Sequence, residues 1–277
     1  MKKLGTPIRT FAGINRPWGV AISQRGEVVV TEEKGHCVSV FSPSGQKIRS
    51  FGTRGSGQGQ FTEPRGVAVD GEGNILVADS SNHHFQKFTA EGQFLVAVGS
   101  NGSGPLQFNS PINVAIHPSN NRVYVVEYYN HRVQVLNSDL TFSSTFGKQG
   151  SGEGQFRYPW GIACDKTGKV YVADTGNHCI QIFTAEGTFL RMFGRRGQGR
   201  GELNLPSAVA IGTNNLVFVS EWFNHRVSVF TSEGQFLVSF GRKGQGPGEF
   251  NFPCGLAVDD SGVVNVCDSG NDRVVLF

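Results

Sequence analysis

The sequence predicts an all-β fold, a six-bladed β-propeller with four-stranded blades, because one pattern recurs along the whole chain. Three kinds of residue return every 47 or 48 positions and keep the same order within each period. A repeat of this length, with several short strands in each unit, is typical of propeller blades. The three series are His36, His83, His131, His178, His225 and Asp272; Pro17, Pro64, Pro111, Pro159, Pro206 and Pro253; and Phe61, Phe108, Phe156, Leu203 and Phe250.

One repeat is enough to justify the four strands of a blade. Residues 160–165 form a short apolar run after Pro159, and proline is tolerated at the start of a strand because no ladder donor is needed there. Residues 170–174 are β-branched and aromatic, 179–183 alternate apolar and polar, and 189–194 form a fourth apolar run. The segments between them contain Gly, Asn and Asp, which suit tight turns.

The two ends of the chain predict how the ring closes. The last repeat, 253–277, stops after its third strand, whereas a spare strand at 7–12 precedes the first proline of the series. Pairing this spare strand with the last repeat would remove two exposed strand edges. We therefore expect one domain, 1–277, with repeats that open near residues 17, 64, 111, 159, 206 and 253.

Composition sets further bounds on the protein class. The formal net charge is only +3, which by itself does not indicate nucleic-acid binding. No apolar run approaches the roughly 18 residues of a membrane span, and no apolar segment follows the first lysines as in a secretory signal. The five cysteines occupy no common place in the repeat, which favours reduced thiols. We expect a cytoplasmic, monomeric domain without membrane association.

The recurring acid and histidine, such as Asp174 and His178 in "ADTGNHCIQIF", raise the question of catalysis or metal binding. A ring places one histidine in each of five blades, whereas zinc needs about four ligands at about 2 Å from one point. We therefore predict that His36, His83, His131, His178 and His225 are structural, and that the chain holds no metal and no cofactor. Asp272 departs from this pattern and puts the equivalent bridge of the last blade in question.

Known catalytic motifs give no support for an enzyme. The chain has no H-E-x-x-H and no G-x-S-x-G, and its glycine-rich segments lack the Lys-Ser/Thr of a phosphate-binding loop. Those glycines recur between blades, which favours a turn function. On these grounds the sequence predicts that the chain is not an enzyme.

The motifs Pro-x-Gly-Val-Ala and Asn-His-Arg-Val-Gln-Val, separated by a β run that ends in an acid, resemble the NHL repeat over essentially the whole chain. The resemblance is closest to the C-terminal propellers of tripartite-motif (TRIM-NHL) proteins. It implies that the propeller recognises RNA or a protein partner, while a separate RING finger transfers ubiquitin. The chain has no C-x₂-C pair, so we expect any ligase activity to reside elsewhere. The amidating lyase has a similar propeller, and a resemblance to it would imply histidine ligands that converge on the central channel. This repeat does not offer such histidines.

The loops that enter each first strand and the turns after each second strand share one face, which we call the top face. Trp18 and Trp160 follow opening prolines three blades apart, so we expect them to face each other across the channel mouth. The loops of this face carry net positive charge if the six repeat acids (Glu32, Asp79, Glu127, Asp174, Glu221 and Asp268) are occupied in hydrogen bonds.

Aromatic rings beside arginines suit single-stranded or stem-loop RNA, and the same mixture is enriched in protein-binding hot spots. We predict RNA recognition, with a protein partner presented to a ubiquitin ligase as the alternative. Fewer basic residues surround this mouth than the resemblance implies, since Ile112, Ser207 and Cys254 stand where Arg65 stands in its blade. The predicted ligand site comprises Arg16, Trp18, Arg65, Tyr128, Tyr129, Arg157, Tyr158, Trp160, Trp222 and Phe223.

Overall fold

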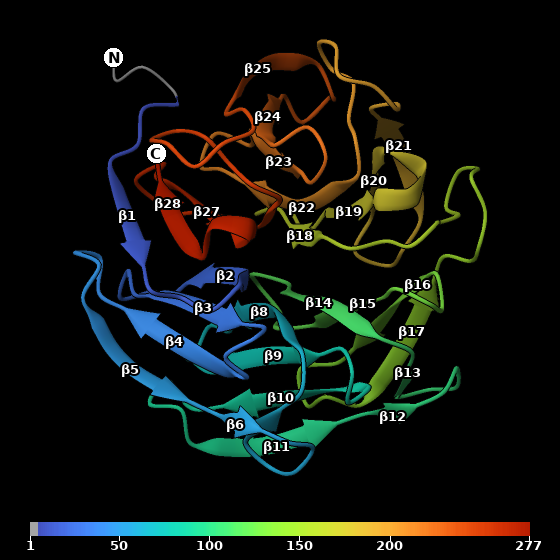
Figure 1. Cartoon of the computed structure of the whole chain (residues 1–277). Helices are drawn as coiled ribbons and strands as arrows, with labels where there is room; N and C mark the ends of the chain where they lie inside the picture. The colour runs from blue at the N-terminus through green and yellow to red at the C-terminus, as the bar shows by residue number, and fades with distance from the viewer. Residues whose placement is uncertain (1–4) are drawn as a thin grey trace.

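Six four-stranded antiparallel sheets surround a central axis in the computed structural model, which describes residues 5–277 (Figure 1). The innermost strands of neighbouring sheets contact one another around the ring. The predicted all-β, six-bladed architecture is confirmed. Within the described residues, no helix is both long and apolar enough to cross a membrane.

Each blade runs from an inner to an outer strand. Blade 1 contains β2 (Pro17–Ile22), β3 (Val28–Glu32), β4 (Cys37–Phe41) and β5 (Lys47–Phe51). Blade 2 contains β8 (Pro64–Val69), β9 (Ile75–Asp79), β10 (His84–Phe88) and β11 (Phe94–Val98). Blade 3 contains β14 (Pro111–Ile116), β15 (Val123–Glu127), β16 (Arg132–Leu136) and β17 (Phe142–Phe146).

The other half of the ring repeats this order. Blade 4 contains β18 (Ile162–Cys164), β19 (Val170–Asp174), β20 (Cys179–Phe183) and β21 (Phe189–Phe193). Blade 5 contains β22 (Pro206–Ile211), β23 (Val217–Glu221), β24 (Arg226–Phe230) and β25 (Phe236–Phe240). Blade 6 contains β26 (Pro253–Val258), β27 (Val264–Asp268), β28 (Arg273–Leu276) and, from the other end of the chain, β1 (Arg9–Ala12).

The ring closes through β1, as the chain ends predicted. β1 pairs antiparallel with β28, with Arg9 opposite Leu276 and Ala12 opposite Arg273. The strand begins two residues later than the predicted range 7–12, and Pro7 has no N–H with which to extend the ladder. Phe11 anchors the seam, because its ring is 2% exposed and stacks on Phe41 at 5.3 Å.

Short pairs and turns complete the connections. The loops between blades contain two parallel pairs, β6 (Thr53–Arg54) with β7 (Gln60–Phe61) and β12 (Ser100–Asn101) with β13 (Gln107–Phe108). Two 3₁₀ turns, η1 (Thr175–Asn177) and η2 (Ser269–Asn271), follow β19 and β27.

The innermost strands approach one another so closely that glycine is required between them. A Cβ on Gly19 would lie 2.3 Å from the carbonyl oxygen of Arg65, and a Cβ on Gly66 would lie 2.4 Å from Cα of Asn113. Neither distance is compatible with a side chain. The backbones of adjacent blades are therefore in direct contact, and the channel is narrow.

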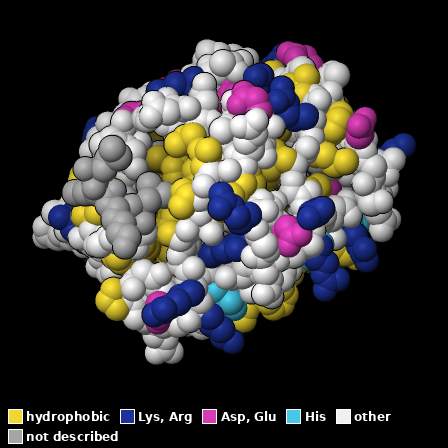
Figure 2. Space-filling model, turned by 90° about the horizontal axis from the view of Figure 1, so that it is seen from above, with side chains coloured by type: hydrophobic (Ala, Val, Ile, Leu, Met, Phe, Trp, Pro, Cys, Tyr) yellow, Lys and Arg dark blue, Asp and Glu magenta, His cyan; other side chains and the backbone are white. Residues whose placement is uncertain are grey.

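The rim of the ring is formed by the outermost strands. These strands expose several apolar side chains, among them Leu190, Met192, Leu237 and Val238. Figure 2 views the ring edge-on and shows apolar side chains interspersed with Lys and Arg.

The histidine of each repeat bonds to the next blade. Each of the five has a left-handed backbone, with φ between 52° and 58°. In four of them Nδ1 accepts a hydrogen bond from a backbone N–H beside the next opening proline. The donors are Ser110 to His83, Tyr158 to His131, Leu205 to His178 and Phe252 to His225, at 3.1–3.2 Å. His36 instead donates from Nδ1 to the carbonyl oxygen of Thr62 at 2.7 Å.

Asp272 makes the same bridge that the sequence put in question. Its Oδ1 accepts the backbone N–H of Arg16 at 2.8 Å, and its φ is 53°. A carboxylate substitutes for the imidazole because the N–H needs only an acceptor at this position. The seam between the last and first blades is thus bonded like the others.

The role of the histidine bridge can be measured with His178→Ala. We expect a loss of about 1–3 kcal/mol in the free energy of unfolding, because the Leu205 N–H would be left without its acceptor. Chemical denaturation of both proteins measures this loss, and metal analysis should be the same for both. Stoichiometric zinc that disappears in the variant would contradict a structural role.

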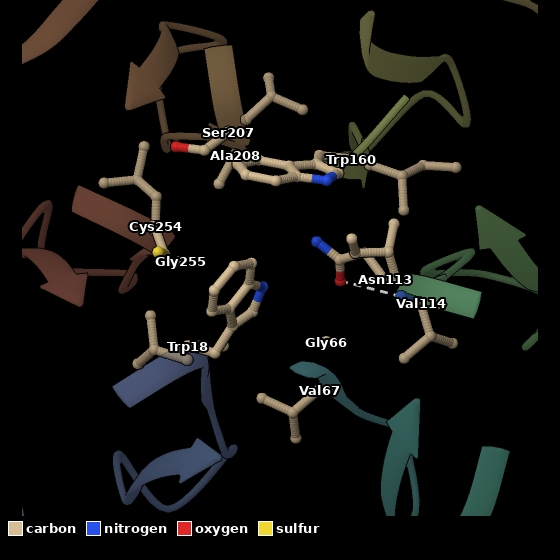
Figure 3. A pocket seen from close by; sticks show the side chains of 16 residues that line it. Trp18, Gly66, Val67, Asn113, Val114, Trp160, Ser207, Ala208, Cys254 and Gly255 are labelled. Carbon is tan, nitrogen blue, oxygen red and sulfur yellow. Dashed lines mark hydrogen bonds between the residues drawn. The ribbon is translucent and has the colours of Figure 1, made fainter. Parts of the chain in front are cut away.

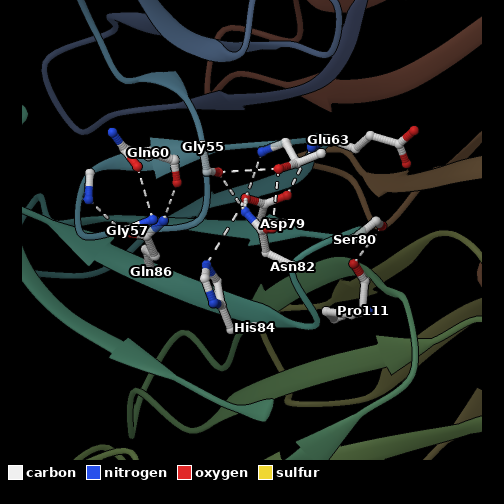
Figure 4. Close-up of polar contacts among 12 residues, drawn as sticks. Gly55, Gly57, Gln60, Glu63, Asp79, Ser80, Asn82, His84, Gln86 and Pro111 are labelled. Carbon is white, nitrogen blue, oxygen red and sulfur yellow. Dashed lines mark hydrogen bonds and ion pairs between the residues drawn. The ribbon is translucent and has the colours of Figure 1, made fainter. Parts of the chain in front are cut away.

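The six repeat acids are buried and hydrogen-bonded, as we expected. Asp79 is fully buried and accepts the backbone N–H groups of Thr62 and Glu63 at 3.0 and 2.9 Å, as well as the Asn82 amide at 2.7 Å (Figure 4). Burial raises the pKa of Asp79 despite these bonds. The other five, Glu32, Glu127, Asp174, Glu221 and Asp268, are at most 4% exposed.

Candidate functional site

Three tryptophans meet at the top of the central channel. Trp18 lies in β2, Trp160 lies just before β18, and Trp222 lies in the turn after β23. Their ring centroids are 5.2–5.6 Å apart, so each ring contacts the other two. The structure thus places Trp18 and Trp160 opposite each other, as their spacing suggested. Trp222 joins them from its turn, where its backbone N–H donates to the carbonyl oxygen of Leu205 at 3.0 Å.

Two further aromatic clusters extend from this centre. The ring centroid of Tyr128 lies 6.3 Å from that of Trp160 and 4.8–4.9 Å from those of Tyr129 and Tyr158. On the other side Trp222 lies 5.1 Å from Phe252, which lies 6.1 Å from Phe223. We call the continuous row of rings, Tyr129, Tyr158, Tyr128, Trp160, Trp222, Phe252 and Phe223, the aromatic band.

The sequence analysis missed Phe252, although a signal for it existed. Phe252 precedes Pro253 just as Tyr158 precedes Pro159, and both backbone N–H groups bond to a repeat histidine. The equivalent places in the other blades hold non-aromatic residues, which is why the pair did not stand out. The band therefore lies on one side of the ring rather than around it.

The ends of the band are exposed and its centre is not. Tyr129 and Phe223 are 57% and 51% exposed, whereas Trp160 and Trp222 at the centre are half-buried, and Trp18 beside them is only 8% exposed. Exposed apolar rings of this size are available to a ligand. Beside Trp160 and Tyr128 lies a bowl of about 450 Å³, within the range of ligand sites. Its lining is Arg16, Trp18, Glu63, Arg65, Ser80, Ser81, His83, Ser110, Tyr128, Tyr129, Trp160 and Trp222.

The two arginines of the bowl are engaged by carboxylates within the protein. Arg16 Nε lies 2.9 Å from one oxygen of Glu33, and Arg65 Nη2 lies 3.2 Å from the other. Arg65 also pairs with Glu63 at 3.2 Å, and its guanidinium lies 4.5 Å from the Trp18 ring centroid. The sequence analysis missed both acids. Glu33 is buried in the place that Tyr128 and Trp222 occupy in their own turns.

Three unpaired cations lie on the loops that enter blades 4 to 6. Arg157, Arg196 and Lys243 are exposed, and within the described chain none of them forms an ion pair. Burial lowers the pKa of His178 and His225, and these cations lower it further, which places them beside the histidine bridges. We call these three residues the basic arc.

Metal ligands do not gather anywhere in the described residues. No group of three or more His, Cys, Asp and Glu side chains is placed to hold a metal ion within residues 5–277. Of the four histidines whose Nδ1 accepts a hydrogen bond, His83 is the one that lines the bowl among the described residues.

Comparison with known families agrees with the repeat pattern. The NHL repeat matches residues 15–41, 61–88, 108–136 and 156–183, and a family described as a 6-bladed beta-propeller matches residues 203–277. The chain is therefore a six-bladed propeller that carries NHL repeats. No curated protein sequence matches it, so the closer resemblance to TRIM-NHL proteins has no support of that kind.

Solved structures of similar fold include enzymes. The chain resembles a streptogramin B lyase (TM-score 0.68, 14% identity, 97% of this chain and 96% of the other). It also resembles virginiamycin B lyase from Staphylococcus aureus (TM-score 0.66, 16% identity, 95% of this chain and 80% of the other). A third similar structure is a gluconolactonase from Xanthomonas campestris (TM-score 0.73, 17% identity, 100% of this chain and 92% of the other).

These structures correct the prediction that the chain is not an enzyme. We excluded catalysis because motifs of hydrolases, zinc proteases and phosphate-binding loops were absent, but those motifs belong to other folds. The lyase and the gluconolactonase have the fold of this chain, so the exclusion was wrong. At 14–17% identity, the likeness extends to the fold and not to a substrate or a reaction.

Proposed function

We propose that the chain is a recognition propeller that binds single-stranded or looped RNA along the aromatic band. The observation that carries this proposal is the juxtaposition of the band with the basic arc on the same blades. Base stacking on aromatic rings and phosphate contacts to Arg and Lys are the two interactions that single strands offer. Both are supplied on blades 3 to 6.

The charge distribution suggests how the strand would lie. Arg16 and Arg65 are neutralised by Glu33 and Glu63, so the centre of the bowl attracts bases rather than phosphates. The unpaired charges of Arg157, Arg196 and Lys243 lie farther out. Bases would therefore point to the band while the phosphates follow the basic arc.

A protein partner is the second candidate, and the neutral bowl favours it. Tyr, Trp and Arg are the residues that dominate protein-binding hot spots, and all three meet here around a compensated ion-pair cluster. In this case the propeller would present its partner to a ubiquitin ligase carried elsewhere. Salt separates the two candidates, because phosphate contacts make log K fall linearly with log salt.

We predict that Phe223→Ala and Tyr129→Ala each weaken RNA binding by about 1–3 kcal/mol, or about 5- to 150-fold. Both rings are more than half exposed, so the free energy of unfolding should change by no more than about 0.5 kcal/mol. RNA selected from a random pool on the wild type provides the ligand, and titration at two salt concentrations gives affinity and slope. Arg196→Ser should reduce the salt slope.

Two controls accompany this experiment. Leu237→Ala removes a 44% exposed apolar side chain from the rim, and Glu91→Ala removes a charge from the opposite face, so neither should alter binding. If no RNA is enriched and a protein partner is lost with Phe223→Ala, the protein candidate replaces RNA at the same site. A ligand whose binding survives Phe223→Ala, Tyr129→Ala and Arg196→Ser would discard the site.

A further inference from the structure

A second cavity lies on the channel axis, directly beneath the tryptophans. Its volume is about 60 Å³, several times the roughly 10–15 Å³ that one water molecule requires. The innermost strands of all six blades contribute to its wall, mostly through Gly, Val, Ile and Leu (Figure 3). Trp18 and Trp160 line this cavity and also the bowl, so they separate the two.

Two of the polar side chains that line the cavity, Trp160 and Asn113, carry N–H donors. Trp160 Nε1 is fully buried and has no hydrogen-bond partner among the described residues. Asn113 Oδ1 accepts the N–H of Val114 at 2.8 Å, which fixes the amide orientation and turns Nδ2 away from Val114. Figure 3 shows the Asn113 side chain reaching into the channel between Trp18 and Trp160, which come from blades on opposite sides.

Acceptors for these donors are lacking among the lining side chains. Within the described part of the chain, none of the lining residues is acidic. Ser207, the one hydroxyl in the wall, already donates to the carbonyl of Pro253 at 2.8 Å and contacts Ser220 Oγ at 3.0 Å. A guest that brings its own negative charge would supply an acceptor for the Trp160 and Asn113 donors.

Asn113 is the exception in its place within the repeat. The corresponding residues are Gly19, Gly66, Gly161 and Gly255 in four blades and Ala208 in the fifth. Close backbone contact favours small residues there. Blade 3 nevertheless places an amide at this position, and only this blade brings a polar side chain to the inner wall at that level.

We propose that this cavity binds a small monovalent anion of the size of chloride or bromide. Hydrogen bonds to a charged acceptor are stronger than those to a neutral one, and buried donors gain most from such a partner. The apolar remainder of the wall offers a polyatomic anion such as sulfate no further donors.

The test compares melting temperatures in sodium chloride, sodium bromide and sodium gluconate at constant ionic strength. A ligand that binds only the folded state raises the melting temperature with its concentration. We expect a saturable rise in chloride and bromide and none in gluconate, together with halide-dependent tryptophan fluorescence. Crystals soaked in bromide should show an anomalous peak within reach of Trp160 Nε1 and Asn113 Nδ2.

Asn113→Gly is the matched variant, because glycine occupies this place in four other blades and introduces no clash. Halide affinity should fall at least tenfold in this variant. Asn120→Gly, the same change at an exposed turn of blade 3, should leave it unaltered. Trp160→Phe keeps the ring but removes the N–H and provides an independent second variant. Equal melting in chloride and gluconate, or bromide density absent from the channel, would show that water alone fills the cavity and would overturn the proposal.

Discussion

Deletion of residues 1–12 will lower the free energy of unfolding by more than about 5 kcal/mol. The deletion removes β1, exposes the free edge of β28, and removes Phe11 from the core. The loss of a buried phenylalanine alone costs about 3–5 kcal/mol, against a total stability of about 5–15 kcal/mol for a protein domain. The exposed edge should also promote aggregation.

Denaturant titration and sedimentation of the shortened chain measure both effects. Phe11→Ala isolates the core contribution, and Ile8→Ala, at a 45% exposed neighbour, serves as the control with little expected effect. If the shortened protein melts like the intact one and stays monodisperse, the ring does not depend on β1 and the closure described above is incorrect.

Arg65→Glu will cost about 3–5 kcal/mol of stability, the range observed when one partner of a buried ion pair is removed. Glu33 is 3% exposed, and the new carboxylate would face it where a guanidinium now lies 3.2 Å away. The cation–π contact with Trp18 would be lost as well. The substitution therefore tests the architecture of the channel mouth more than the charge offered to a ligand.

Arg157→Glu provides the comparison, because Arg157 is exposed and unpaired among the described residues. We expect its stability to change by no more than about 0.5 kcal/mol, while RNA binding weakens most at low salt. Thermal and chemical denaturation of both variants decide the matter. Equal stability of Arg65→Glu and the wild type would mean that Glu33 does not need its partner.

The fold was predictable because repetition supplies many copies of the same weak signals. Strand ends vary by a residue or two, as at β1, yet the period places every blade. The same period places Trp18 and Trp160 opposite each other, since they occupy one position three blades apart. A residue can therefore be placed on the ring without a structure when its position within the repeat determines which strand or turn it occupies.

Other features depended on contacts that a slot does not define. Trp222 reaches the centre because its turn folds inward, and Arg65 is neutralised by Glu33 from the neighbouring blade. Both features depend on which way a side chain points toward a neighbouring blade, and the position of a residue within the repeat does not reveal this direction. The bridge at Asp272 was put in question for another reason: we treated the histidine as necessary, whereas the Arg16 N–H can donate to any well-placed acceptor.

The turns after β15 and β23 have a consequence for how such a protein can change. In blade 2 the equivalent turn, Ser80-Ser81, also follows a buried acid, and Ser80 Oγ donates to the carbonyl oxygen of Pro111 in the next blade without any aromatic ring. The scaffold therefore tolerates either kind of turn. The aromatic rings of blades 3 and 5 are additions to hydrogen bonds between blades that form without them. The turns Tyr128-Tyr129 and Trp222-Phe223 can therefore be exchanged for Ser-Ser while the strands and the bonds between blades stay in place.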